Sequence, residues 1–119
     1  MTPEPTEFRY DRQARLLHVA FADGKHLALS AEYLRVESPS AEVQGHGPDQ
    51  KKLVAGRRHV GIIGIEPVGK YAVRLIFDDL HDSGIYSWDY LLELGQQYDR
   101  RWPAYLQALA ESGSSREPG

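Results

Sequence analysis

The sequence has 119 residues, a length that fits one domain with a core of its own. Hydrophobic residues make up 41% and charged residues 26%, so the chain is expected to fold by itself, and the absence of cysteine excludes thiolate ligands and thiolate nucleophiles. A net charge of -3 disfavours nucleic acid and anionic membrane surfaces as partners.

The two ends of the chain are expected to be flexible tails. Residues 1–6 are rich in Pro and Glu, and residues 112–119 are rich in Ser, Gly and Pro, so neither can bury much apolar surface. Residues 7–111 are expected to form a single domain.

The domain is predicted to open with a β-hairpin. Apolar residues alternate over residues 16–21 and again over 27–29. The Asp-Gly pair at 23–24 supplies the positive φ angles of a type I′ turn between them. Phe8 and Tyr10 predict a short third strand upstream.

A short helix and a long connection follow. Ser30 is typical of an N-cap, and Glu32 in the first turn suits the dipole of a helix over residues 31–36, which Pro39 ends. Residues 37–59 are polar and rich in Gly and basic residues, which is typical of a mobile or functional loop.

The second half of the domain is predicted to contain another hairpin and two helices. Strand patterns over 60–65 and 71–77 flank a Gly-Lys turn. Ser87 is typical of the N-cap of the first helix, and apolar residues from Trp102 to Leu109 recur at helical spacing in the second. The predicted fold is α+β: a small, mostly antiparallel sheet built from two hairpins, with a short helix after the first hairpin and two C-terminal helices.

The densest polar cluster lies between the second hairpin and the Ser87 helix. Its carboxylates and imidazole, from Asp78, Asp79, Asp82 and His81, could bind a divalent metal ion. Their spacing matches neither an EF-hand loop, nor an H-E-x-x-H helix, nor the H-x-D of an iron-oxygenase triad. The preferred interpretation is a turn held by side chain to backbone hydrogen bonds, with a metal site as the alternative.

A basic cluster marks the 37–59 connection. It contains Lys51, Lys52, Arg57 and Arg58, with His46 between two glycines nearby. The cluster is either a solvated loop or a docking surface for an acidic protein or ligand, and we take it as the candidate partner-binding loop. No G-x-S-x-G elbow or other nucleophile and base pair occurs in the sequence.

Three stretches together resemble a known family. Residues 33–40 (YLRVESPS), 65–73 (IEPVGKYAV) and 78–91 are similar to the gamma-butyrobetaine-hydroxylase-like N-terminal domain, and the resemblance spans residues 7–95. In carnitine-pathway hydroxylases such a domain precedes a jelly-roll that holds iron and 2-oxoglutarate, and similar domains are appended to some P-loop iron–sulfur carrier proteins. The jelly-roll is missing here, so we do not expect hydroxylase activity.

The resemblance also implies the loss of a zinc site. The hydroxylase domain binds a structural zinc through three cysteines and one histidine. Matched by motif, the cysteine positions fall on Ser38, Ser40 and Val43, the histidine falls on His81, and the glycine before the histidine is Leu80. We therefore expect His81 and Ser38 or Ser40 to lie close together, joined by hydrogen bonds instead of a metal.

These observations favour a non-enzymatic accessory or adaptor domain without a cofactor. We expect it to bind an unidentified protein partner, in metal-cofactor or oxygenase-related metabolism, and not to bind nucleic acid or membrane. A metal-binding protein that uses iron or zinc at His81 and the neighbouring aspartates is the alternative. The N-terminus has no basic stretch followed by an apolar run, so we expect a cytoplasmic location.

Overall fold

The strands of the protein form two antiparallel sheets of three strands each, in a computed structural model that describes residues 2–45 and 47–118. One sheet has the order β1-β2-β3 and the other the order β4-β5-β6. The strands are β1 (Pro5–Asp11), β2 (Leu16–Phe21), β3 (His26–Ser30), β4 (Ile62–Val68), β5 (Ala72–Phe77) and β6 (Gly84–Ser87). The predicted α+β class and its two hairpins are confirmed, while β6 and the separation into two sheets were not foreseen.

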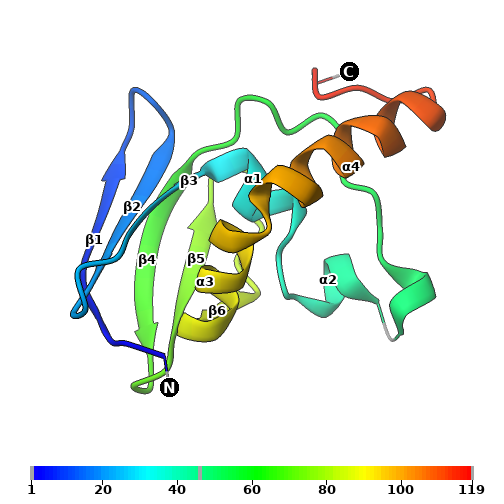
Figure 1. Ribbon diagram of the computed structural model, residues 1–119. Helices are drawn as coiled ribbons and strands as arrows, with labels where there is room; N and C mark the ends of the chain where they lie inside the picture. Colours follow the sequence, from blue (N-terminus) through cyan, green and yellow to red (C-terminus); the bar gives the residue numbers. More distant parts are fainter. Residues whose placement is uncertain (1, 46, 119) are drawn as a thin grey trace.

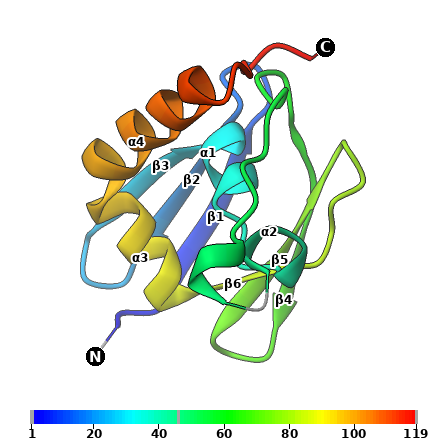
Figure 2. The same ribbon diagram turned by 90° about the vertical axis from the view of Figure 1, so that its right-hand side faces the viewer.

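The helices gather on one side of the sheets (Figures 1 and 2). They are α1 (Ala31–Val36), α2 (Ala41–Gln44), the 3₁₀ helix η1 (Pro48–Gln50), α3 (Trp88–Gln96) and α4 (Tyr98–Glu111). Both predicted serine caps are confirmed, since Ser30 Oγ accepts a hydrogen bond from Tyr33 N at 3.0 Å and Ser87 Oγ accepts one from Tyr90 N at 3.1 Å. Within the described residues no helix is long and apolar enough to span a membrane.

The first hairpin follows the predicted alternation but not the predicted turn. Leu17, Val19 and Phe21 are buried along β2, as period-2 spacing requires. Only Gly24 of the Asp-Gly pair has a positive φ, of 92°. The type I′ prediction is wrong because four residues, rather than two, separate β2 from β3.

The helix α1 lies at the centre of the molecule, and all six of its residues are buried. Tyr33 and Leu34 belong to the main hydrophobic core, which also takes side chains from both sheets and from α3. Two charged residues of α1, Glu32 and Arg35, and its C-cap residue Glu37 are buried as well. Buried charges of this kind are tolerated only when they are paired, so the partners of α1 determine how the surrounding segments are placed.

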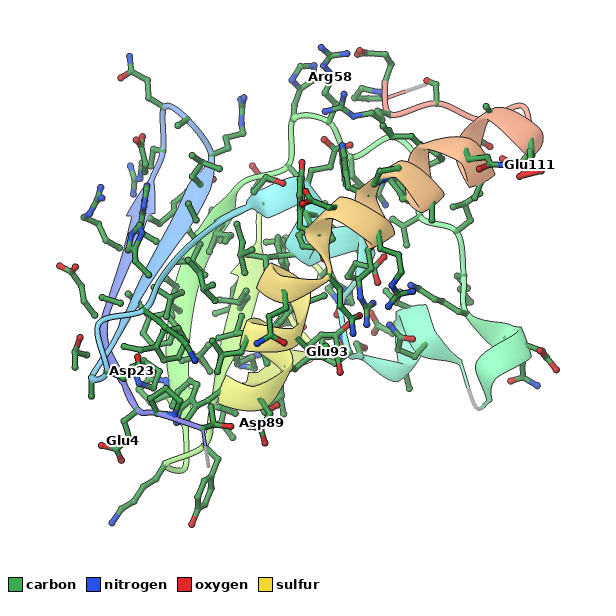
Figure 3. The ribbon with its side chains drawn as sticks, viewed as in Figure 1. Glu4, Asp23, Arg58, Asp89, Glu93 and Glu111 are labelled. Carbon is green, nitrogen blue, oxygen red and sulfur yellow. The ribbon has the colours of Figure 1, made fainter. Side chains whose placement is uncertain are left out.

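The two chain ends are more structured than their composition indicates. The strand β1 begins at Pro5, inside the segment expected to be a tail. At the other end, Ser115 O accepts from Gly56 N at 2.9 Å and Arg116 O accepts from Arg58 N at 3.0 Å. The last segment therefore lies against residues 56–58 (Figure 3, beside Arg58).

Candidate functional site

The turn between β5 and β6 brings the predicted polar cluster against the segment after α1. His81 Nε2 lies 2.8 Å from Ser38 Oγ, and His81 Nδ1 lies 3.0 Å from Glu42 Oε2. Ser40 Oγ lies 2.7 Å from Ser83 Oγ. The expected proximity of His81 to Ser38 is thus present, through hydrogen bonds. Val43, the third position matched to a cysteine, is buried on α2 and has no atom able to bind a metal at its side chain.

Gly84 makes this close approach possible. A Cβ atom at residue 84 would lie 2.5 Å from Ser38 Oγ and 3.0 Å from the ring of Tyr86. Any larger residue at the start of β6 would push the 38–40 segment away from His81. The glycine is visible in the sequence as part of the Ser-Gly pair at 83–84. Its role depends on the contact between β6 and the 38–40 segment, which the sequence alone does not show.

Ser38, His81 and Glu42 have the order of contacts found in a serine, histidine and carboxylate triad. Their environment differs from that of an active site, because Ser38 is 0% exposed and His81 is 5% exposed. Ser38 Oγ also accepts a hydrogen bond from Ser40 N at 3.2 Å. A hydroxyl without exposed surface cannot reach a substrate in this arrangement, and the three residues form a hydrogen-bonded network that joins the turn to the segment after α1.

The network makes the stability of the fold depend on pH. Burial, together with the nearby charge of Arg35, lowers the pKa of His81, although Glu42 opposes the shift. The folded state therefore favours the neutral imidazole, and the resulting stability is complete above the titration of free histidine, at about pH 6.5, and lost as the pH falls below it.

We expect the free energy of unfolding to fall between pH 7.5 and pH 5, and His81→Gln to remove part of this dependence because glutamine does not titrate. Urea denaturation at several pH values measures it. His59→Gln, at an exposed histidine, controls for the loss of an imidazole elsewhere. A wild-type stability that stays constant over this range would contradict the assignment.

Asp79, the neighbour of His81, is the centre of an ion-pair cluster. Its Oδ2 accepts from Arg35 Nε at 2.8 Å and from Arg57 Nε at 2.7 Å, and its Oδ1 accepts from His81 N at 3.1 Å. Burial opposes ionisation, but these hydrogen bonds outweigh it and lower the pKa of Asp79. Both carboxylate oxygens are therefore occupied by the protein itself.

The remaining residues of the proposed metal site do not converge. Asp82 is exposed and lies 3.5 Å from Arg74, and Asp78 Oδ2 lies near Gly61. Among the residues that the structure describes, no group of three or more histidine, aspartate or glutamate side chains could hold a metal ion. The alternative of a metal site at His81 and its aspartates finds no support in this geometry, because the ring nitrogens face Ser38 and Glu42 and Asp79 faces two arginines.

Leu80, between Asp79 and His81, has a strained backbone. Its φ is 73°, in the left-handed region, and its side chain is 83% exposed. An L-residue there costs about 1–2 kcal/mol, and the exposed side chain offsets little of it. The resemblance described in the sequence implies glycine at this position, so the departure at Leu80 coincides with a backbone position that favours glycine.

We expect Leu80→Gly to stabilise the fold by about 0.5–1 kcal/mol, since relief of the strain exceeds the added entropy of the unfolded chain. Thermal or urea unfolding measures the change. Leu80→Ser removes the exposed leucine but keeps the β-carbon, so it serves as the matched control with little effect. A gain of stability equal in both variants would show that the side chain, not the backbone, was responsible.

The basic cluster is not a free docking patch in its entirety. Lys51 Nζ pairs with Glu37 at 2.8 Å, Arg57 with Asp79, and Arg58 Nη1 with Glu117 at 2.6 Å. Lys52 is exposed on the same segment. The predicted partner-binding residue His46 lies outside the described residues. The interpretation of this segment as a solvated loop was incomplete, because carboxylates distant in the sequence form ion pairs with three of its cations.

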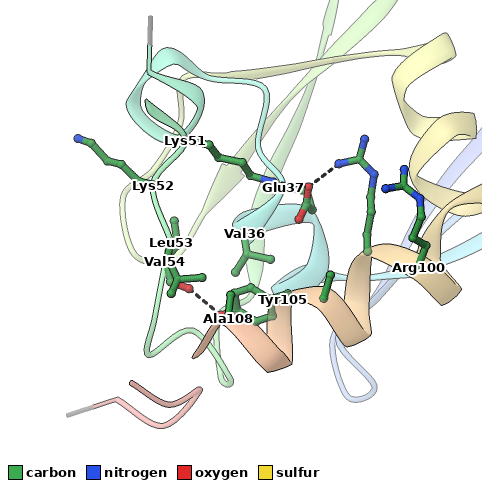
Figure 4. Close-up of a pocket in the computed structure, with 11 residues that line it drawn as sticks. Val36, Glu37, Lys51, Lys52, Leu53, Val54, Arg100, Tyr105 and Ala108 are labelled. Atoms are coloured by element: carbon green, nitrogen blue, oxygen red, sulfur yellow. Dashed lines mark hydrogen bonds and ion pairs between the residues drawn. The ribbon is translucent and has the colours of Figure 1, made fainter. Parts of the chain in front are cut away.

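A pocket of about 450 Å³ lies between residues 51–54 and α4 (Figure 4). Four basic side chains line it, of which Lys52 and Arg100 are exposed at the rim, together with the buried carboxylate of Glu37 and a mainly apolar floor. The lining residues that sequence reasoning missed are Val36, Glu37, Leu53, Val54, Arg100, Arg101, Ala104, Tyr105 and Ala108. One signal was available, because Arg100, Ala104 and Ala108 recur every four residues on one side of a predicted helix.

Comparison with known proteins assigns the fold to a family. The family model described as gamma-butyrobetaine hydroxylase-like, N-terminal, matches residues 8–92, well over half of the chain. The chain belongs to this family. The gamma-butyrobetaine hydroxylase-like N-terminal match begins within β1, covers the other five strands and α1, and ends within α3, so the pocket's helix α4 lies beyond it. No curated protein matches the chain.

Three solved structures are similar to this member of the gamma-butyrobetaine hydroxylase-like N-terminal family over most or all of its length. One solution NMR structure is 44% identical, with a TM-score of 0.84 over 100% of this chain and 94% of the other. A second is 46% identical, with a TM-score of 0.86 over 98% and 87%. A crystal structure from Acidithiobacillus ferrooxidans ATCC 23270, described as a protein with unknown function of the DUF971 family, is 39% identical with a TM-score of 0.66 over 77% and 92%.

Proposed function

We propose that this chain is a non-enzymatic accessory domain that binds a protein partner through the face formed by residues 51–54 and α4. The observation that carries the proposal is the contrast between two places in the fold. The Ser38 hydroxyl and the His81 ring are closed to solvent, whereas the pocket beside α4 is open and combines a basic rim with an apolar floor.

The scaffold beneath this face supports a binding role. The pocket wall at residues 51–54 is fixed on two sides, because Lys52 N donates to Val43 O at 2.7 Å and Tyr105 Oη donates to Val54 O at 2.6 Å. A wall that is already ordered loses less entropy when a partner binds.

A steric block of the pocket tests the proposal. The tagged chain is immobilised, bound proteins are captured from an extract of the organism that encodes it, and cross-linking identifies which surface they contact. Ala104→Trp fills the pocket, whereas Ala110→Trp adds the same bulk at an exposed position of α4 that does not line it. We expect a specific protein to be retained by the wild type and Ala110→Trp, and reduced at least ten-fold by Ala104→Trp.

Two outcomes would contradict the proposal. One is a partner that both tryptophan variants retain equally, which would place the binding face elsewhere. The other is the absence of any protein enriched over an empty column, at protein concentrations where weak interactions survive.

A further inference from the structure

The pocket beside α4 has the dimensions of a groove for an extended chain. Arg100, Ala104 and Ala108 stand four residues apart, so they form one stripe along the helix. Eight residues of helix rise about 12 Å, which is the length of about four residues of extended peptide. The two alanines leave room for another backbone to approach α4 closely.

The chain itself shows which chemistry the rim accepts. The buried carboxylate of Glu37 is held by Lys51 Nζ at 2.8 Å and by Arg101 Nη1 at 2.5 Å. In Figure 4, Lys51 reaches toward Glu37, while Lys52 points outward from the rim. Lys51 and Arg101, the two inner cations, thus form a carboxylate-binding site that the chain's own Glu37 already occupies.

Two outer cations flank this filled site. Lys52 and Arg100 are both exposed, and Arg100 Nη2 donates to the neutral amide oxygen of Gln97 at 2.8 Å. A carboxylate from outside the chain would meet them at the mouth of the pocket. The molecule as a whole carries a net charge of -3, so it repels extended anionic surfaces. The attraction of these two cations acts only at short range, and it therefore favours a single acidic group at the pocket.

The apolar floor of the pocket favours a ligand that also carries an apolar side chain. Val36 and Tyr105 are buried there, and Leu53 is 40% exposed at the edge. The hydrogen bond from Tyr105 Oη to Val54 O fixes the ring, so its apolar surface is presented in one orientation. An apolar side chain entering beside Leu53 would cover surface that is otherwise in contact with water.

We infer that this pocket binds a short acidic segment of a protein partner in an extended conformation. Its carboxylates meet Lys52 and Arg100, and an apolar side chain between them enters beside Leu53. The inference rests on the proposed function and specifies the chemistry of the partner at the same face.

Synthetic peptides test this chemistry with the purified chain alone. A fluorescein-labelled octapeptide of alternating Glu and Leu is the probe, and a Glu/Ser octapeptide and a Lys/Leu octapeptide are the matched controls. Fluorescence anisotropy at low salt measures binding. We expect the Glu/Leu peptide to bind at least ten-fold more tightly than either control, with an affinity that falls as salt is raised.

Charge reversal locates the binding. Lys52→Glu with Arg100→Glu is expected to weaken binding of the Glu/Leu peptide at least ten-fold. Arg12→Glu with Lys70→Glu makes the same change in net charge at exposed positions away from the pocket, and is expected to change binding less than two-fold. All four side chains are exposed, and unfolding temperatures confirm that both variants are folded.

Each other outcome would overturn the inference. Equal binding of the Glu/Leu and Lys/Leu peptides would exclude charge selection, and equal binding of the Glu/Ser peptide would exclude the apolar requirement. Equal weakening by both double variants would exclude this location. The peptide assay is independent of the captured partner, so a partner that needs the pocket without peptide binding would retain the proposed function and reject the acidic segment.

Discussion

Replacing Asp79 with alanine is expected to lower the free energy of unfolding by about 3 kcal/mol, because it leaves two guanidinium groups without their carboxylate. The side chain of Arg35 is only 9% exposed, and its Nη1 is buried without a hydrogen-bond partner among the described residues, so water cannot readily replace Asp79. The loss of the hydrogen bond from His81 N would add to the cost. Urea denaturation at pH 7 measures the change.

Asp82→Ala is the matched control on the same turn. Asp82 is exposed and its contact with Arg74 spans 3.5 Å, so its removal is expected to cost less than about 1 kcal/mol. Adding Arg35→Met to Asp79→Ala should recover part of the loss, since it removes the uncompensated cation. Equal costs for the two aspartate variants would refute the ion-pair role of Asp79.

Replacing Arg116 with alanine is expected to lower the free energy of unfolding by about 2 kcal/mol, although the residue lies in a segment that composition marks as a tail. Arg116 Nε and Nη2 donate to the two carboxylate oxygens of Glu32 at 2.9 and 2.6 Å. The Glu32 side chain is 6% exposed, so loss of the arginine leaves a buried charge unpaired. The guanidinium also lies 5.4 Å from the ring centre of Trp102, and this cation–π contact would be lost too. Urea denaturation again gives the value.

Arg58→Ala provides the comparison for this prediction. Arg58 pairs with Glu117 of the same C-terminal segment, but both side chains are about half exposed, so a cost below about 0.5 kcal/mol is expected. Glu32→Met combined with Arg116→Met should be less destabilising than Arg116→Ala alone. If the two arginine variants behaved alike, the segment would not be anchored through Glu32.

The backbone elements were predictable because their signals are local. Alternation along β2 and β5 and the serine caps of α1 and α3 depend on neighbouring residues, and each appears in the structure where the pattern placed it. The four residues of α2 are too few for helical periodicity to be seen. The proximity of Ser38 and His81 followed from the family resemblance, which carries long-range information that spacing alone lacks.

The charge pairs could not be predicted in the same way. Glu32 and Arg116 are separated by 84 positions, and Glu37 and Arg101 by 64. The charges of α1 need partners because the helix is buried, and that burial arises only when the whole fold is assembled. It cannot be seen from neighbouring residues in the sequence. For the same reason the basic residues near position 57 looked free in the sequence, and the pocket beside α4 went unnoticed.

We propose that this domain acts by binding at the face of residues 51–54 and α4, while the turn of His81 is structural. Amide hydrogen–deuterium exchange of the domain, with and without its captured partner, tests it most directly. We expect slower exchange on binding at residues 51–54 and 100–108, and unchanged exchange at 38–42 and 79–83. Protection confined to the His81 turn and the 38–42 segment would contradict it.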